Sequence, residues 1–356
     1  MTQNTLLIPG LEHIRPEPDF ERLRRAVLRK GKQGELPFLE LFADAEIKQA
    51  IMGRPVANMA DEIEFWYRLG YDSVPFGIPL FFPQERTLHE DTAELPHEVR
   101  GWVTEEAAFI RDRNDFEKYP WPDPNTVEVA GIEDTAWLLP DGMRFIVGAF
   151  GIFETVSWLM GYSRMCTLVY DAPDLIADMF HRIGEIVLAS LSKFTNCRDV
   201  GAVFFGEDMG FKTATMLAPE VLRRHLFPWM KKIADACHDA GKPLILHSCG
   251  NLEQVMDDLI DYVGIDAKHS FEDAIIPVNQ MVSKYSKRIG IVGGVDVDFL
   301  SRRSVEEVRE YVRGIIRECA PSGAYMLGTG NSVANYIRVE NYLAMLEEGW
   351  RYRMGG

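Results

Sequence analysis

Residues 219–250, PEVLRRHLFPWMKKIADACHDAGKPLILHSCG, contain the repeating unit of the fold. The part up to Gly241 has the apolar spacing of an amphipathic helix, and PLILHSCG (243–250) is a short, nearly continuous apolar strand. Such strands are buried on both faces, which is typical of parallel sheets whose strands alternate with helices. The stretch therefore predicts an α/β protein.

Similar strands recur along the chain, each followed by a helical pattern. A (β/α)8 TIM barrel is expected, because eight alternating units are enough to close a parallel sheet on itself. An open doubly wound sheet is the alternative, but the first β–α turn has no GxGxxG motif and the number of strands is high. The expected strands are residues 37–43, 71–77, 144–151, 201–208, 243–250, 264–270, 289–296 and 323–330.

Two segments are expected to lie outside the regular units of one domain covering residues 1–356. Residues 1–35 form an N-terminal helical extension, whose basic helix in FERLRRAVLRKGKQGELP (20–37) is expected to end at Gly34. Residues 83–140 are rich in proline, tryptophan and acidic residues, and are expected to form a helical excursion over the barrel mouth between strands two and three.

Composition limits the classes of partner and compartment. The net charge of −16 disfavours nucleic acid, because phosphate binding requires a basic face. The five cysteines are scattered without a CxxC pair, which suits a reducing compartment. The N-terminus does not have the pattern of a signal peptide, and no apolar run reaches the ~18 residues of a membrane span. We expect a cytoplasmic protein that binds neither nucleic acid nor membrane.

Polar side chains gather where the later strands are expected to end. In a (β/α)8 barrel the carboxyl ends of the strands meet at one rim, and the chemistry is carried there. The residues expected at this rim are Glu207, Asp208, His247, Cys249, His269, Glu272, Asp296 and Asn331.

His247 and Cys249 are the strongest candidates for a metal site. Alternate residues of an extended chain point the same way, so both side chains can reach one point. Imidazole nitrogen and thiolate sulfur are favoured zinc ligands. An isolated H-x-C is more often a buried thiol beside a hydrogen-bonded histidine, but the neighbouring carboxylates favour the metal site here.

A catalytic zinc site usually has three protein ligands and one open position. Glu272 is the first choice for the third ligand, Glu207 the second, and His269 a less favoured one. Asp208 and Asp296 are expected to hold the ligands in place or to bind substrate. The candidate catalytic residues are therefore Glu207, Asp208 and Asp296, and the candidate cofactor contacts are Gly250 and Asn331.

From about residue 20 to its end, the chain resembles the uroporphyrinogen decarboxylase superfamily. The stretches that carry the resemblance are WPDP (121–124), GIFETVSWLMG (151–161), residues 216–251, GGVD (293–296) and VENYLAMLEEG (339–349). The superfamily has two main arms: decarboxylases of tetrapyrrole acetate groups, which use no metal, and zinc-dependent methyltransferases that work with a corrinoid.

The motifs place this chain with the methyltransferases. HSCGN (247–251) matches their H-x-C-G zinc motif, and DAKHSFED (266–273) puts Glu272 at the family's carboxylate position. The decarboxylase signature R-Q-A-G-R is missing, and the comparable region reads GRPVANMADEIEF (53–65). Thiol-specific methyltransferases carry a further zinc cysteine near the end of strand eight, where this chain has LGTGNSV (327–333), so the ligand set departs from that pattern.

The resemblance implies a zinc-dependent methyltransferase that moves a methyl group from a small methylated substrate, of the oxygen-methyl type, to a corrinoid on a partner protein. Two alternatives remain open. One is a decarboxylase of a smaller substrate with Asp208 or Asp296 as acid, and the other is a non-catalytic zinc- or corrinoid-binding protein.

Overall fold

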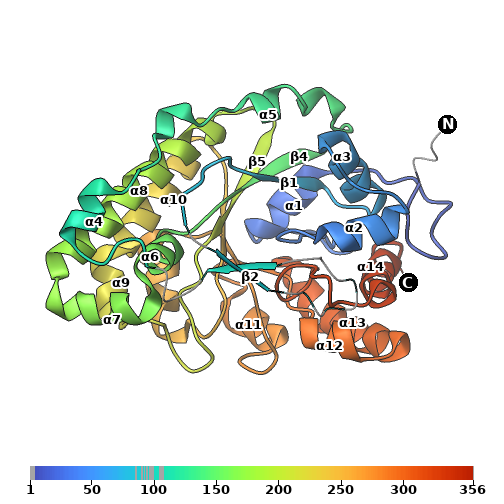
Figure 1. Ribbon diagram of the computed structural model, residues 1–356. Coiled ribbons are helices and arrows are strands. Elements are labelled where there is room, and N and C mark those ends of the chain that lie inside the picture. The colour runs from blue at the N-terminus through green and yellow to red at the C-terminus, as the bar shows by residue number, and fades with distance from the viewer. Residues whose placement is uncertain are drawn as a thin grey trace.

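The core of the molecule is one curled parallel sheet, seen in a computed structural model (Figure 1). The structure describes residues 5–355 apart from 85, 90, 92, 94, 96–99 and 104–107, with only the backbone described at 86–89 and 100–103. The seven strands neighbour one another in chain order, as in a TIM barrel, which confirms the expected fold class. They are β1 (Ser73–Gly77), β4 (Arg144–Ala149), β5 (Val200–Gly206), β6 (Leu244–His247), β7 (Ala267–His269), β8 (Gly290–Val292) and β9 (Tyr325–Met326).

The first of the eight expected strands is not a regular strand. Residues 37–43 lie beside β9 and pair with the chain there only through isolated parallel bridges, from Phe38 to Leu327 and from Ala43 to Val333. Leu39 N donates to Leu327 O, and Leu327 N donates to Pro37 O. Because Pro37 has no N–H group, the segment cannot form a continuous ladder from its first residue. The expectation of eight regular strands is therefore wrong at this segment.

Helices surround the sheet, as the alternation of patterns predicts. They are α2 (Ala45–Met52), α3 (Met59–Arg68), α6 (Ile152–Met160), α7 (Tyr162–Asp171), α8 (Pro173–Thr195), α9 (Pro219–His225), α10 (Phe227–Asp239), α11 (Val278–Tyr285), α12 (Val297–Arg302), α13 (Val305–Cys319) and α14 (Val339–Arg353), with the short turns η3 (Glu253–Val255), η4 (Asp258–Val263) and η5 (Ala320–Ser322). Among the described residues, none of the helices is both long and apolar enough to cross a membrane.

The excursion at 83–140 contains a small sheet as well as helices. β2 (Arg86–His89) and β3 (Arg100–Val103) form an antiparallel pair, followed by α4 (Arg113–Lys118), η1 (Pro124–Thr126), α5 (Ala130–Glu133) and η2 (Ala136–Leu138). Asn335, in the loop after β9, donates from Nδ2 to Asp91 Oδ2 at 2.6 Å and to Leu95 O at 2.9 Å. The excursion therefore contacts the loop after β9, and it contains an antiparallel pair of strands beside the expected helices.

The N-terminal helix α1 (Phe20–Val27) closes the opposite end of the sheet. Its residues Phe20, Leu23 and Val27 pack in one cluster with the inward-facing residues of the strands, including Ile146 and Ile245. A side chain could not be added at Gly201, because a Cβ there would lie 2.2 Å from the Phe20 ring. The helix ends at Val27 and not at Gly34, and Arg29 then adopts a left-handed φ of 60°.

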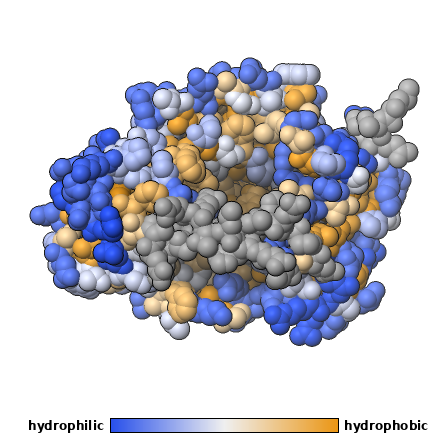
Figure 2. Space-filling model, viewed as in Figure 1, coloured by the Kyte–Doolittle hydropathy of each residue, from blue (hydrophilic) through white to orange (hydrophobic). Residues whose placement is uncertain are grey.

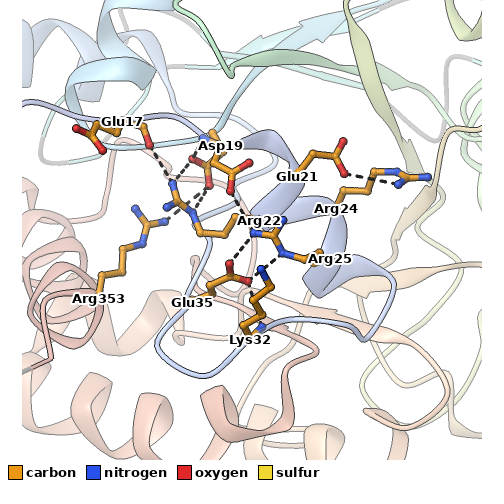
Figure 3. A network of polar contacts seen from close by, with 10 residues as sticks. Glu17, Asp19, Glu21, Arg22, Arg24, Arg25, Lys32, Glu35 and Arg353 are labelled. Atoms are coloured by element: carbon orange, nitrogen blue, oxygen red, sulfur yellow. Dashed lines mark hydrogen bonds and ion pairs between the residues drawn. The ribbon is translucent and has the colours of Figure 1, made fainter.

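The basic side chains of α1 are held in ion pairs within the protein (Figure 3). Arg22 Nη2 lies 2.5 Å from Asp72 Oδ1, and Arg25 Nη2 lies 2.6 Å from Glu35 Oε1. Arg353, at the end of α14, extends this network, with Nη2 4.0 Å from Asp72 Oδ2. These contacts fix α1 and the C-terminal helix to the same end of the sheet.

The distribution of side chains on the surface leaves an apolar region near the centre of one face. Figure 2 shows hydrophilic residues around the periphery of this face, and apolar residues gathered toward a hollow in its middle.

Candidate metal centre

The register of three neighbouring strands brings their last residues into one row. Gly206 at the end of β5 pairs with His247 at the end of β6, and His247 pairs with His269 at the end of β7. The residues immediately after these positions therefore meet at the carboxyl end of the sheet. Asp208 follows β5, and Cys249 follows β6.

Asp208, His247 and Cys249 form a group whose ligand atoms all lie within 4.8 Å of one another. His247 Nε2 is 3.4 Å from Asp208 Oδ1 and 3.6 Å from Cys249 Sγ. His247 is buried, and the other two residues are half-buried. One nitrogen, one sulfur and one oxygen from three residues is a donor set that fits zinc with a position left open.

Two side chains donate hydrogen bonds to the sulfur of Cys249. Ser270 Oγ lies 3.4 Å from Sγ, and Asn331 Nδ2 lies 3.3 Å from it. Ser270 has a φ of 81°, which is rare outside glycine and is typical of residues constrained at functional sites. Burial, followed by the charge of Asp208, raises the pKa of the Cys249 thiol to about 12, so a bound cation would be needed to make it a thiolate at neutral pH.

His247 is available as a neutral ligand. Burial lowers its pKa to about 3, with a smaller effect from Lys268. His269 lies against it, with 2.9 Å between their Nδ1 atoms, and is not a member of the group of three. The candidates His247 and Cys249 are thus brought together as expected.

The carboxylates predicted from the sequence lie in different places. Glu272 lies outside the group of three and lines a small adjoining pocket with Lys268. Glu207 is fully buried and accepts N–H groups from Ile152 at 2.6 Å and Glu154 at 3.2 Å, at the start of α6. Among the described residues, the carboxylate that joins His247 and Cys249 is that of Asp208. From the sequence, Asp208 was expected to hold the ligands in place or to bind substrate.

The remaining predicted residues are Asp296, Gly250 and Asn331. Asp296 caps α12, where its Oδ1 accepts N–H groups from the next turn. Gly250 has a φ of 80°, and a Cβ there would lie 2.3 Å from the backbone of Gly210, so glycine allows the loops after β5 and β6 to touch. Asn331 contacts Cys249 directly. The roles of Gly250 and Asn331 as cofactor contacts stay predictions.

Most of this chain matches a known protein family. The family model described as "Uroporphyrinogen decarboxylase (URO-D)" matches residues 103–352. The chain belongs to the uroporphyrinogen decarboxylase family. A curated relative from Anaeromyxobacter dehalogenans (strain 2CP-C), described as "Uroporphyrinogen decarboxylase", is 22% identical over 258 residues, which cover 68% of this chain and 70% of the relative.

A solved structure of the same fold is described as a methyltransferase from Methanosarcina mazei. It has a TM-score of 0.67 and 16% sequence identity, and the match covers 94% of this chain and 99% of that one. At this identity the likeness shows the fold alone. It agrees with the TIM-barrel-like sheet of this uroporphyrinogen decarboxylase family member.

Two residues near the centre were missed by the sequence analysis. Lys268 is buried, and its Nζ donates to the carbonyls of Ser248 at 3.1 Å and Ser270 at 2.8 Å, which ties the ends of β6 and β7 together. Burial raises the pKa of the Glu154 carboxyl to about 8, and the nearby charge of Asp208 adds to this. A lysine within an apolar strand was a usable signal, whereas Glu154 lies in an ordinary helical pattern.

A buried carboxyl in the segment beside β9 predicts that the stability of the protein depends on pH. Burial raises the pKa of Glu40 from 4.5 to about 8, although it accepts hydrogen bonds from Thr329 N at 2.9 Å and Thr329 Oγ1 at 2.6 Å. Between these two values the folded state keeps a proton that the unfolded state has released. The contribution of Glu40 to the free energy of unfolding is therefore fully present below about pH 4.5. It falls as the pH rises toward about 8, by on the order of 1.4 kcal/mol per pH unit.

Glu40→Gln is expected to flatten this fall in the free energy of unfolding between about pH 5 and 8. Urea denaturation at several pH values measures it, with Glu128→Gln at an exposed position as the control. An unchanged slope in Glu40→Gln would show that Glu40 is ionised in the folded protein.

Proposed function

We propose that this protein is a zinc-dependent methyltransferase that takes a methyl group from a small oxygen-methyl donor and passes it to a corrinoid carried by a partner protein. The observation that carries the proposal is the group of Asp208, His247 and Cys249 at the carboxyl end of the sheet, where barrels of this kind hold their chemistry. The likeness of fold to a methyltransferase supports it.

The residues of this chain divide the work as follows. His247, Cys249 and Asp208 would hold zinc, which when bound would supply Lewis acidity to the donor's heteroatom. Ser270 and Asn331 keep the Cys249 sulfur in place through their hydrogen bonds. Asp208 accepts the backbone N–H of Cys249 at 2.7 Å, so the loops after β5 and β6 are fixed to each other.

Methyl transfer would balance with the reductant that the partner brings. The donor's carbon–oxygen bond would break with its electron pair left on oxygen, and the reduced corrinoid, when bound, would supply the pair for the new bond to the methyl carbon, which is a formal two-electron oxidation of its cobalt. The resulting alkoxide or phenolate takes up a proton on release.

Decarboxylation is the second candidate, because the family model and the curated relative are both described as uroporphyrinogen decarboxylase. A substrate with several carboxylates calls for clustered arginines, since each carboxylate needs a cationic partner. Arg54 is the only arginine in residues 53–65, and it pairs with Asp61 at 2.6 Å and Glu64 at 2.7 Å. This stretch therefore supports methyl transfer over decarboxylation.

The test supplies zinc-loaded protein with either a reduced corrinoid and a methylated donor, or uroporphyrinogen. We expect methylation of the corrinoid, which its absorption spectrum monitors. We expect no loss of uroporphyrinogen, because the net charge of −16 disfavours a polyanionic substrate. Coproporphyrinogen formed at enzymatic rates would reverse the choice between the two activities. Zinc binding without either turnover would favour the non-catalytic binding protein.

A further inference from the structure

A chain of hydrogen bonds runs behind His247, on the side of the ring away from Cys249. His247 Nδ1 lies 2.9 Å from His269 Nδ1, and His269 Nε2 lies 3.1 Å from the carbonyl oxygen of Thr329. Both histidines are buried. The two imidazoles and the carbonyl thus form a continuous line from β6 across β7 to the end of β9.

The chemistry of the last group in the line determines where every proton lies. A carbonyl oxygen only accepts, so His269 carries its proton on Nε2 and donates it to Thr329. In a neutral imidazole the other nitrogen is then a bare acceptor. His247 must therefore carry its proton on Nδ1 and donate it to His269 Nδ1. This leaves the lone pair of His247 on Nε2.

The Nε2 atom of His247 is the one that faces the candidate metal position. It lies 3.4 Å from Asp208 Oδ1 and 3.6 Å from Cys249 Sγ. We propose that His269 is a positioning residue, which fixes His247 in the Nδ1–H tautomer so that the Nε2 lone pair is directed at the metal. The proposal rests on the zinc site of the proposed function.

The structure holds His269 itself in one orientation. A Cβ at Gly293 would lie 3.0 Å from His269 Nε2 and 2.2 Å from Thr329 O, so only glycine, here with a φ of 75°, leaves room for this contact. The Phe204 ring packs edge-on against His269 with 5.4 Å between ring centroids.

Thr329 is held in turn by Glu40, in the segment of residues 37–43 that lies beside β9. Its backbone N–H and its hydroxyl both donate to the buried carboxyl of Glu40. The residue whose carbonyl accepts the hydrogen bond from His269 is therefore anchored by Glu40, in the segment beside β9. At protein zinc sites, a histidine ligand usually donates its second N–H to a carboxylate, a backbone carbonyl or water, which fixes its orientation. Here a second histidine, His269, takes the place of that partner.

The direct test uses metal-free protein labelled with ¹⁵N-histidine, and long-range ¹⁵N–¹H correlations that distinguish the two neutral tautomers. We expect His247 to be protonated at Nδ1 and His269 at Nε2, with the signals assigned from single variants. A His247 protonated at Nε2 would overturn the proposal. Because no metal is present, this result does not depend on the proposed function.

A pair of variants tests the consequence for zinc. His269→Asn places an amide oxygen close to the former Nδ1 and can still accept from His247, whereas His269→Leu cannot. We expect zinc affinity to fall by roughly 10- to 100-fold in His269→Leu and to be largely retained in His269→Asn. His181→Leu, on the exposed face of α8, is the matched control.

The outcomes separate the two hypotheses. Equal zinc affinity in wild type and His269→Leu would overturn the positioning role. Wild-type protein that binds no zinc would end the zinc proposal and leave the tautomer measurement to decide the arrangement of protons. If His269→Leu does not fold, as judged by circular dichroism, the His269→Asn variant and the wild-type spectrum still give the answer.

Discussion

Cys249→Ser is expected to reduce the zinc content of the purified protein from about one ion per chain to a small fraction of that value. Thiolate is the strongest zinc donor in the group of three, and Cys249 Sγ lies 3.6 Å from His247 Nε2. The loss of affinity should exceed the roughly 10- to 100-fold typical of residues that only orient a ligand. Elemental analysis after dialysis and competition with a chelator measure the content and the affinity.

Cys197→Ser, which changes a half-buried cysteine two residues after α8, is the matched control and should keep its zinc. Asp208→Asn and Glu272→Gln then decide the third ligand. We expect the first to lose zinc affinity and the second to keep it, because only Asp208 shares the group with His247 and Cys249. Stoichiometric zinc in the His247→Ala, Cys249→Ser double variant would show that no metal binds here.

The part of the centre that the sequence predicted comes from a single strand. His247 and Cys249 are two residues apart, and alternation along an extended chain is a local property that needs no knowledge of neighbours. Asp208 reaches the same point from β5, which depends on the pairing of Gly206 with His247. Register between strands is set by packing, so the sequence could place Asp208 at the rim but not in the group.

Glu207 and Asp208 illustrate the same difference. Consecutive residues of an extended chain point in opposite directions, so only one of the two can face the candidate metal position. Glu207 instead reaches the start of α6, where free backbone N–H groups favour a carboxylate. The position of that helix end is a tertiary feature, and the sequence pattern left both residues as candidates.

The fold itself was largely predictable because the alternation of apolar strands and amphipathic helices is repeated many times. The errors fall where the repeat is irregular. The segment at 37–43 begins with Pro37, which has no N–H group, and pairs with its neighbour only through isolated bridges. The antiparallel pair of β2 and β3 lies in a stretch whose proline and charge content hid its pattern. Both errors concern local hydrogen bonding, and neither changes the order of the sheet.

The second large effect concerns the methyl donor. We expect oxygen-methyl donors such as methoxyaromatics to be demethylated fastest and nitrogen-methyl donors such as methylamines more slowly. Thiols should be poor acceptors in the reverse reaction. Each thiolate ligand would donate charge to zinc and soften it, and the group of three offers one cysteine sulfur. The hydrogen bonds from Ser270 and Asn331 withdraw further charge from that sulfur. With zinc bound, such a site would be a stronger Lewis acid than one with two thiolates, which would suit the departure of an oxygen.

The residue that decides this selectivity is expected to be Asn331. The loop after β9 reaches the Cys249 sulfur through an amide nitrogen at 3.3 Å, where a thiol-specific site would have a second thiolate. Asn331→Cys should therefore shift the activity from methoxyaromatics toward thiols, while Asn331→Ser, which adds no thiolate, should not. The assay compares a panel of donors with reduced corrinoid and, in reverse, methylated corrinoid with thiols. Wild-type activity confined to thiol methylation would mean that the number of thiolate ligands does not determine the substrate, since a single sulfur would then be enough to bind and activate a thiol.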